Sequence, residues 1–212
     1  MLIYMIRGGI MVLGQRDEVL LDIYSIDYLL KCSVLESNQQ ILLLSPVSGK
    51  IDIFMKHDPV VLIKHDDGNI NVTSGEVADI DKSARCVAMK IRDEEIPEER
   101  RFFERYPASL MVSARKKYSN KRMYMRVRNI SMYGMGAISE VELDEGESVD
   151  IDLITERNML YFSGKVIWRE QMDDVFEYGL QLTHCDVATR YLLQEYLNKQ
   201  KPNYLSMIPK AK

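Results

Sequence analysis

Two short motifs decide how this chain is interpreted: Arg101-Phe102-Phe103-Glu104-Arg105, and Asn129-Ile130-Ser131-Met132-Tyr133-Gly134, which begins 24 residues after Arg105. Residues 100–139, which contain both, carry ten basic side chains and one acidic side chain. The segments on either side are acidic, so the chain of 212 residues has a net charge of −4, which argues against a general nucleic-acid binder. Positive potential is therefore concentrated in one stretch, where it attracts an anion.

The first motif lies in a charged segment that separates two strand-rich halves of the chain. Residues 92–105 are almost all charged and include Pro97, so they cannot bury a face and are expected to form a solvated connector. Alternating or β-branched stretches between turn residues predict strands on both sides. These stretches are residues 19–24, 28–35, 40–44, 50–55, 60–65, 69–74, 75–81 and 84–90, then 109–114, 123–129, 136–139, 148–154, 160–168 and 176–182. Their short, regular spacing favours small barrels or sandwiches, and Asp66-Asp67-Gly68-Asn69 predicts a hairpin.

The end of the chain has a different pattern. Apolar residues recur at helical spacing in Asp186–Leu197, behind an aspartate that suits an N-cap, so this segment is predicted to be a helix that covers the second barrel. We therefore predict an all-β chain of two small β-barrel domains, residues 1–92 and 107–200. A charged linker at 93–106 joins them, the C-terminal α-helix packs on the second barrel, and 201–212 form a flexible tail.

Composition and motifs argue against several classes of protein. The three cysteines are scattered without a disulfide or metal spacing, which favours a reducing cytoplasm. The apolar start, Met1–Leu13, is interrupted by Arg7 and is too short to span a membrane. It also lacks a small-residue cleavage site after a basic n-region, which argues against a signal peptide. Met11 offers an alternative start, which would leave residues 1–10 as a loose extension. The three histidines are dispersed, and no P-loop, nucleophile elbow or dinucleotide fingerprint occurs, so we expect no metal, no cofactor and no enzymatic activity.

The two motifs contain the residue types that bind a planar, phosphorylated ligand. A guanidinium is a planar fork that pairs with a phosphate or with the edge of guanine, and three of them occur at Arg100, Arg101 and Arg105. Asn129 can both donate to and accept from a purine, and Ser131 offers a hydroxyl. Gly134 removes a Cβ where a ligand or the turn needs room, and it permits a positive φ. Each motif alone is ordinary, a solvated linker and an Asx turn respectively, but together they are much more specific.

Arg101-x-x-x-Arg105 followed by Asn129-x-Ser131-x-x-Gly134, in a β-rich domain with a closing helix, resembles the PilZ family, which binds the bacterial second messenger cyclic di-GMP. The likeness covers residues 98–198 and continues in Gly164–Trp168 and Tyr178–Leu182. The resemblance implies that both motifs contribute to one ligand site. The first motif supplies Arg100, Arg101 and Arg105, and the second supplies Asn129, Ser131 and Gly134. Gly136 and Trp168 are secondary candidates. Tyr133 and Met135 stand where the family usually has small residues.

The first half of the chain resembles the N-terminal barrel of the YcgR-like flagellar-brake proteins, through its layout and Ser45-Pro46-Val47-Ser48-Gly49. The resemblance implies a non-enzymatic cytoplasmic effector that binds cyclic di-GMP and then changes the orientation between its domains. Its expected partner is a protein at the flagellar motor, with recruitment to the flagellar basal body and slower swimming as the output. Under this interpretation we expect no membrane span and no binding of a nucleic-acid polymer.

Three alternatives stay open at this point. The output could be the synthesis or export of exopolysaccharide, or the chain could be a nucleotide-free PilZ adaptor that acts through protein contacts alone. The basic stretch 100–128 could instead bind RNA or DNA, which steep salt dependence would reveal. The basic residues around Asn120 are either a solvated hairpin tip or a surface for steering or partner contact. Trp168 is either a packing residue or a stacking residue.

Overall fold

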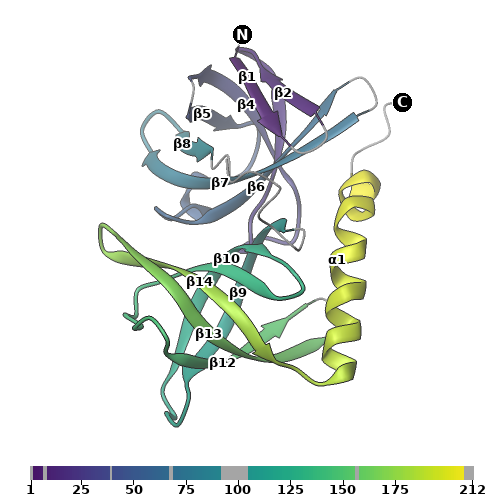
Figure 1. The fold of residues 1–212 in the computed structure, drawn as a ribbon. Coiled ribbons are helices and arrows are strands. Elements are labelled where there is room, and N and C mark those ends of the chain that lie inside the picture. The colour runs from purple at the N-terminus through teal and green to yellow at the C-terminus, as the bar shows by residue number, and fades with distance from the viewer. Residues whose placement is uncertain are drawn as a thin grey trace. The chain divides into compact units, whose positions relative to one another are not determined.

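The computed structural model describes residues 2–6, 9–38, 40–66, 69–91, 105–155 and 158–207. The chain divides into two compact units, the first formed by Met1–Pro97 with Pro107–Ser109 and the second by Glu98–Tyr106 with Leu110–Lys212. Each unit contains a closed barrel of six antiparallel strands, and a single long helix follows the last strand (Figure 1). The predicted all-β fold with two small barrels and a C-terminal helix is confirmed.

The first barrel has the strand order β3-β4-β5-β8-β7-β6. Its strands are β3 (Glu18–Asp22), β4 (Leu30–Ser37), β5 (Ile41–Pro46), β6 (Pro59–Asp66), β7 (Asn69–Asp81) and β8 (Cys86–Ile91). The predicted hairpin is confirmed, because β6 and β7 pair from Asp66 with Asn69. β7 is one strand where the sequence predicts two: Gly75 pairs with Val60 on one side and with Ile91 on the other, so the strand passes from one partner to the next. A glycine suits such a bend at a barrel corner.

Two segments of the first unit differ from the prediction. Residues 50–55 are predicted as a strand, but Ile51–Ile53 form a 3₁₀ turn, η1. Ile51 and Phe54 are both buried, which is the three-residue spacing of a 3₁₀ turn and not the two-residue spacing of a strand. The chain also begins with a strand pair that the sequence did not predict, because β1 (Leu2–Ile6) pairs with β2 (Gly9–Leu13) in a separate two-stranded sheet.

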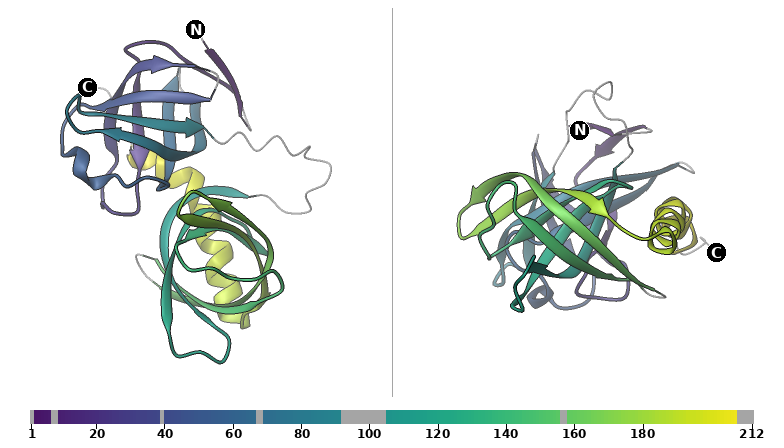
Figure 2. Two further views of the ribbon diagram at one scale, coloured as in Figure 1. Left: turned by 90° about the vertical axis from the view of Figure 1, so that its left-hand side faces the viewer. Right: turned by 60° about the horizontal axis from the view of Figure 1, so that its bottom comes forward.

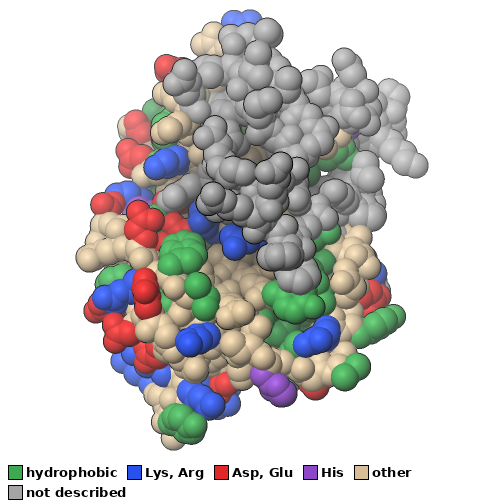
Figure 3. All heavy atoms as spheres, viewed as in Figure 1, with side chains coloured by type: hydrophobic (Ala, Val, Ile, Leu, Met, Phe, Trp, Pro, Cys, Tyr) green, Lys and Arg blue, Asp and Glu red, His purple; other side chains and the backbone are tan. Residues whose placement is uncertain are grey.

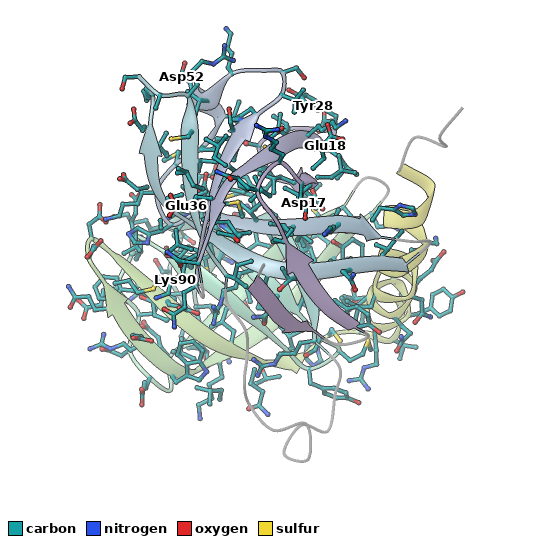
Figure 4. The ribbon with its side chains drawn as sticks, turned by 90° about the horizontal axis from the view of Figure 1, so that it is seen from above. Asp17, Glu18, Tyr28, Glu36, Asp52 and Lys90 are labelled. Carbon is teal, nitrogen blue, oxygen red and sulfur yellow. The ribbon has the colours of Figure 1, made fainter. Side chains whose placement is uncertain are left out.

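Acidic side chains of the first half lie on the outside of its barrel, with Asp58 and Glu76 as buried exceptions. Figure 4 shows the labelled side chains of Glu18, Glu36 and Asp52 around this barrel, and all three are exposed. The interior is instead filled by aliphatic side chains, among them the fully buried Leu21 and Leu44. The alternation of buried and exposed positions along the strands therefore separates the charge from the core, as expected for a small barrel.

The second barrel has the strand order β10-β11-β14-β13-β12-β9 (Figure 2). Its strands are β9 (Tyr106–Lys116), β10 (Arg122–Ile130), β11 (Gly134–Ser139), β12 (Ser148–Ile154), β13 (Met159–Met172) and β14 (Val175–His184). Buried apolar side chains alternate along every strand and form the interior. These include Val112, Ala114, Met125, Val127, Met135, Ala137, Ile151, Leu153, Phe162, Val166 and Leu180.

The helix α1 (Val187–Met207) packs against β13 and buries Leu193 and Leu197. Asp186 caps it as predicted, since the Thr189 N–H donates to Asp186 Oδ1 over 2.8 Å. This hydrogen bond, together with that from the Thr189 hydroxyl, holds the pKa of Asp186 below its usual value. The helix is longer than predicted and includes residues 201–207, which the sequence assigns to the tail. Pro202 removes one backbone donor, but the helix continues past it to Met207.

Two absences apply only to the described residues. No helix among them is both long and apolar enough to cross a membrane. No group of three or more His, Cys, Asp or Glu side chains among them is arranged to hold a metal ion.

Candidate functional site

The second motif forms the hairpin between β10 and β11. The Ser131 N–H donates to the Gly134 carbonyl over 2.8 Å, and the Ser131 hydroxyl donates to the same oxygen over 3.1 Å. Ser131 Oγ also accepts from the Tyr133 N–H at 3.4 Å. Ser131 therefore holds the turn closed with its own side chain, and its hydroxyl is fixed at the tip of the hairpin while only 5% of the residue is exposed.

A β-bulge in β10 determines which way Asn129 points. Val127 pairs with Ala137, but the next pair is Asn129 with Gly136, so Arg128 is an extra residue without a counterpart in β11. Val127 is fully buried in the barrel interior, and strict alternation would direct Asn129 into the interior as well. The bulge shifts the register by one residue and directs Asn129 to the outer face.

On that outer face the Asn129 side chain lies over Gly136. The Gly136 N–H donates to Asn129 Oδ1 over 3.1 Å. A Cβ on Gly136 would lie 2.9 Å from Asn129 Nδ2 and 3.0 Å from Oδ1, which leaves no room for a larger residue without moving the carboxamide. The glycine therefore creates the space in which the carboxamide of Asn129 is held in one orientation.

A second bulge repeats this arrangement in β13. Val166 pairs with Leu180, and the next pair is Trp168 with Gly179, so Ile167 is the extra residue. Val166 points into the barrel, and the bulge directs Trp168 to the outer face in the same way that the first bulge directs Asn129. A Cβ on Gly179 would lie 2.0 Å from Trp168 Nε1, so the indole rests directly on the glycine backbone.

The two bulges build one continuous row across four neighbouring strands. Asn129 pairs with Gly136, Gly136 with Gly179, and Gly179 with Trp168. Residues paired in this way present their side chains to the same face of the sheet. The row therefore has a floor of two glycines, with a carboxamide at one end and an indole at the other. Such a surface suits a flat ligand that offers hydrogen-bonding edges.

Gly134 has no Cβ at a place where the fold leaves no room for one. A Cβ there would lie 2.7 Å from the backbone oxygen of Leu180, so the residue must be small because β14 approaches closely. The positive φ that a glycine permits is not used here, since Gly49 and Gly146 are the glycines with positive φ in the described part of the chain. The two bulky residues beside it separate: Met135 is buried in the barrel, whereas Tyr133 is 43% exposed at the hairpin tip.

The predicted arginines are placed only in part. Arg100 and Arg101 lie outside the described residues. Arg105 is exposed and directly precedes β9. β9 and β10 close the barrel and follow each other along the chain, so the start of β9 and the end of β10 lie at the same end of the barrel. This topology brings Arg105 to the end of the barrel that carries the Asn129–Gly134 hairpin.

Much of the remaining positive charge is already paired. The described ion pairs of this region join basic residues of β9 and β10 to acidic residues near or in β12 and β14. They are Arg115 with Asp150 at 3.4 Å, Lys116 with Glu147 at 3.0 Å, Arg122 with Asp152 at 3.0 Å, and Arg128 with Glu177. Figure 3 likewise shows Lys and Arg side chains interspersed with Asp and Glu on the visible face.

Sequence reasoning missed the two bulges, and with them the roles of Gly179, Arg128 and Glu177. A bulge leaves no mark in the residue types themselves, because Arg128 and Ile167 are ordinary residues for a strand. The sequence singled out Tyr178–Leu182 as a strand, but the contact between Gly179 and Trp168 follows only from the register between β13 and β14.

Comparison with known proteins gives one family and several similar folds. The model of the PilZ domain matches residues 99–199. No curated protein matches the chain. Three solved structures are similar over most of the chain. They are the Bacillus subtilis inhibitor of motility MotI/DgrA (16% identity, TM-score 0.43, covering 90% of this chain and 99% of that one), YcgR from Escherichia coli in complex with c-di-GMP (13%, 0.43, 90% and 86%), and the K. pneumonia MrkH–c-di-GMP complex (8%, 0.44, 91% and 90%).

Proposed function

We propose, from the match of residues 99–199 to the PilZ domain, that the chain is a non-enzymatic cyclic di-GMP effector that acts on a protein partner. The observation that carries the proposal is the row Asn129–Gly136–Gly179–Trp168 on the outer face of the second barrel. The row lies beside the hairpin that holds Ser131, at the end of the barrel where β9 begins directly after Arg105.

The chemistry of the ligand matches this surface. Cyclic di-GMP has two guanines and two phosphates, so it needs flat faces, donors and acceptors for base edges, and cations. The two glycines admit a base close to the backbone, and the indole of Trp168 offers an aromatic face for stacking. The carboxamide of Asn129 faces a base edge, while Arg101 and Arg105 bind phosphates or the O6/N7 edge of guanine through their guanidinium forks. Arg100 adds to the positive potential.

The output that we propose is a change in the orientation between the two domains. The arginine motif belongs to the segment that joins the barrels, so a ligand bound to its arginines can change the orientation between the two domains. The rearranged surface then meets its partner. The resemblance of the first half to flagellar-brake proteins makes the flagellar motor the first candidate, with reduced swimming as the consequence.

Isothermal titration calorimetry of the full chain with cyclic di-GMP tests the ligand. We expect Arg105→Ala to weaken binding by about 5- to 150-fold, which corresponds to the roughly 1–3 kcal/mol of a good bidentate arginine contact with guanine. Arg122→Ala is the matched control, because this arginine of the same basic stretch pairs with Asp152 and should not be needed for the ligand.

The chain contains one tryptophan, so fluorescence of Trp168 gives a second signal for the same event. A guanine stacked on the indole should quench its emission on titration. Absence of binding heat in the wild type, or equal affinity in Arg105→Ala, would overturn the ligand assignment. Plain RNA or DNA oligonucleotides that compete with equal strength would point instead to a nucleic-acid binder, whose affinity should fall steeply with salt.

A further inference from the structure

Arg128 occupies an unusual position beside the proposed site. It is the extra residue of the β10 bulge, and it immediately precedes Asn129. Its guanidinium Nη2 contacts the Glu177 carboxylate of β14, a side chain that is 1% exposed, while the side chain of Arg128 itself is 12% exposed. β11 lies between β10 and β14, so the ion pair spans about 10 Å between strand axes.

Two other charged residues lie in the same row of this face as Glu177. Arg126 pairs in register with Ile138, and Ile138 with Glu177, and this row runs alongside the row that contains Asn129. Glu177 in turn pairs with Glu170 of β13, which is exposed. The buried carboxylate thus has a second acid on one side and a second arginine in its row, and it is contacted by the guanidinium of Arg128. A buried charge that loses its partner is strongly unfavourable, so each side chain of the pair holds the other in place.

This geometry gives Arg128 two possible roles that make opposite predictions. Were Arg128 a ligand arginine, Glu177 would compete with the ligand for it, and removing the carboxylate would strengthen binding. Were the pair structural, removing the carboxylate would release the bulge, and the register that directs Asn129 outward would loosen. The near-complete burial of Glu177 and the position of Arg128 within the bulge favour the second role.

We infer that the Arg128–Glu177 ion pair is a brace that holds the β10 bulge and so fixes the orientation of Asn129. Arg128 is then a positioning residue and not one of the arginines that bind the ligand. The functional consequence of the brace rests on the proposed function. The brace itself concerns the free protein and is tested without any ligand.

The backbone amide of Gly136 reports the orientation of Asn129, because its N–H donates to Asn129 Oδ1. The resonance of this amide in a ¹H–¹⁵N NMR spectrum of the full chain should shift in Asn129→Ala, because the hydrogen bond is lost. The chemical shift in that variant serves as the reference for a broken hydrogen bond. We expect Glu177→Gln and Arg128→Lys to move the Gly136 resonance toward that position. Lysine keeps the charge of Arg128 but lacks the planar fork, so the brace should be weaker in Arg128→Lys than in the wild type.

In parallel, calorimetry measures the affinity for cyclic di-GMP. We expect Glu177→Gln to weaken binding about tenfold, in line with the coupling between residues in contact. Glu170→Gln removes the same charge from the neighbouring strand and should change neither the Gly136 resonance nor the affinity. If a single variant does not fold, Arg128→Met with Glu177→Met replaces the buried pair by apolar groups of similar size, which proteins often tolerate. The Gly136 resonance should still move in this double variant.

Two results would overturn the brace. One is a Gly136 resonance that stays at the wild-type position in Glu177→Gln and in the double variant. The other is tighter binding of cyclic di-GMP by Glu177→Gln, which would make Arg128 a ligand arginine. If the wild type fails to bind cyclic di-GMP, the proposed function fails, but the Gly136 resonance still decides whether the brace exists.

Discussion

Replacing Gly179 with alanine tests the contact that forms one end of the proposed site. The added Cβ would lie 2.0 Å from Trp168 Nε1, 2.4 Å from Cε2 and 2.6 Å from Cδ1. Non-bonded heavy atoms approach to about 3.5 Å, so the indole must move by about 1.5 Å or rotate away from the sheet. Because the backbone of β14 is fixed by pairing on both sides, we expect the side chain to move and the strand to stay.

The expected cost and its spectroscopic signature follow from this displacement. Overpacking of this kind destabilises a protein by about 1–3 kcal/mol. The indole of Trp168 is only partly buried and can rotate toward solvent, so we expect a loss at the lower end of this range. Urea denaturation measures this loss in the free energy of unfolding. Trp168 is the one tryptophan of the chain, so its emission should shift to longer wavelength and acrylamide should quench it more strongly. Loss of the stacking surface should also weaken binding of cyclic di-GMP by about 5- to 150-fold, from the 1–3 kcal/mol of base–aromatic stacking.

Gly14→Ala is the matched control for this substitution. A Cβ on Gly14 would meet its nearest atom, Asp17 Oδ2, at an ordinary 3.7 Å, so neither stability nor emission should change much. The reasoning is refuted if Gly179→Ala has the emission maximum and the acrylamide quenching of the wild type, because the indole would then not rest on the glycine.

Two further outcomes concern stability. Gly134→Ala should destabilise the fold by about 1–3 kcal/mol in urea denaturation, because its Cβ would meet the backbone oxygen of Leu180 at 2.7 Å, and an unchanged midpoint would contradict the close approach. Burial would raise the pKa of Asp17, but its hydrogen bond from the Gly14 N–H and its pairing with Lys64 outweigh burial and hold the pKa below its usual 3.8. The ionised form therefore stabilises the fold above about pH 4, and this contribution disappears as the pH falls through the lowered pKa. Asp17→Asn should accordingly lower the melting temperature at pH 7 and have little effect at pH 2.5, and an equal effect at both pH values would argue against the pairing.

The fold could be predicted well from the sequence because strand periodicity and turn residues are local signals. The sequence prediction failed where a segment has the residue pattern of one structure but adopts another. Residues 50–55 alternate like a strand, yet the burial of Ile51 and Phe54 shows a 3₁₀ turn, and Gly75 looked like a break although β7 continues through it. Pro202 suggested the end of the helix, but the helix continues past it to Met207 although one donor is missing.

For the candidate site, the sequence identified residue types but not the face on which they lie. Asn129 follows Val127 and Met125 at the spacing of interior positions, so periodicity alone would have placed it in the core. Its outward orientation depends on Arg128 as the extra residue of the β10 bulge, and the corresponding orientation of Trp168 depends on Ile167 in the β13 bulge. Long-range register of this kind is decided by the pairing of strands, which no single segment encodes.

The bulge in β10 has a consequence for how the length of this strand can vary. Deletion of the single codon for Arg128 would make Asn129 the direct neighbour of Val127, so strict alternation would still direct Asn129 to the outer face, and Asn129-x-Ser131-x-x-Gly134 would remain intact in the sequence. The same deletion would remove the guanidinium that contacts Glu177. Two related chains that differ in length by this one residue can therefore present the same motif on the same face, so a one-residue gap before the motif is not evidence that the site is lost.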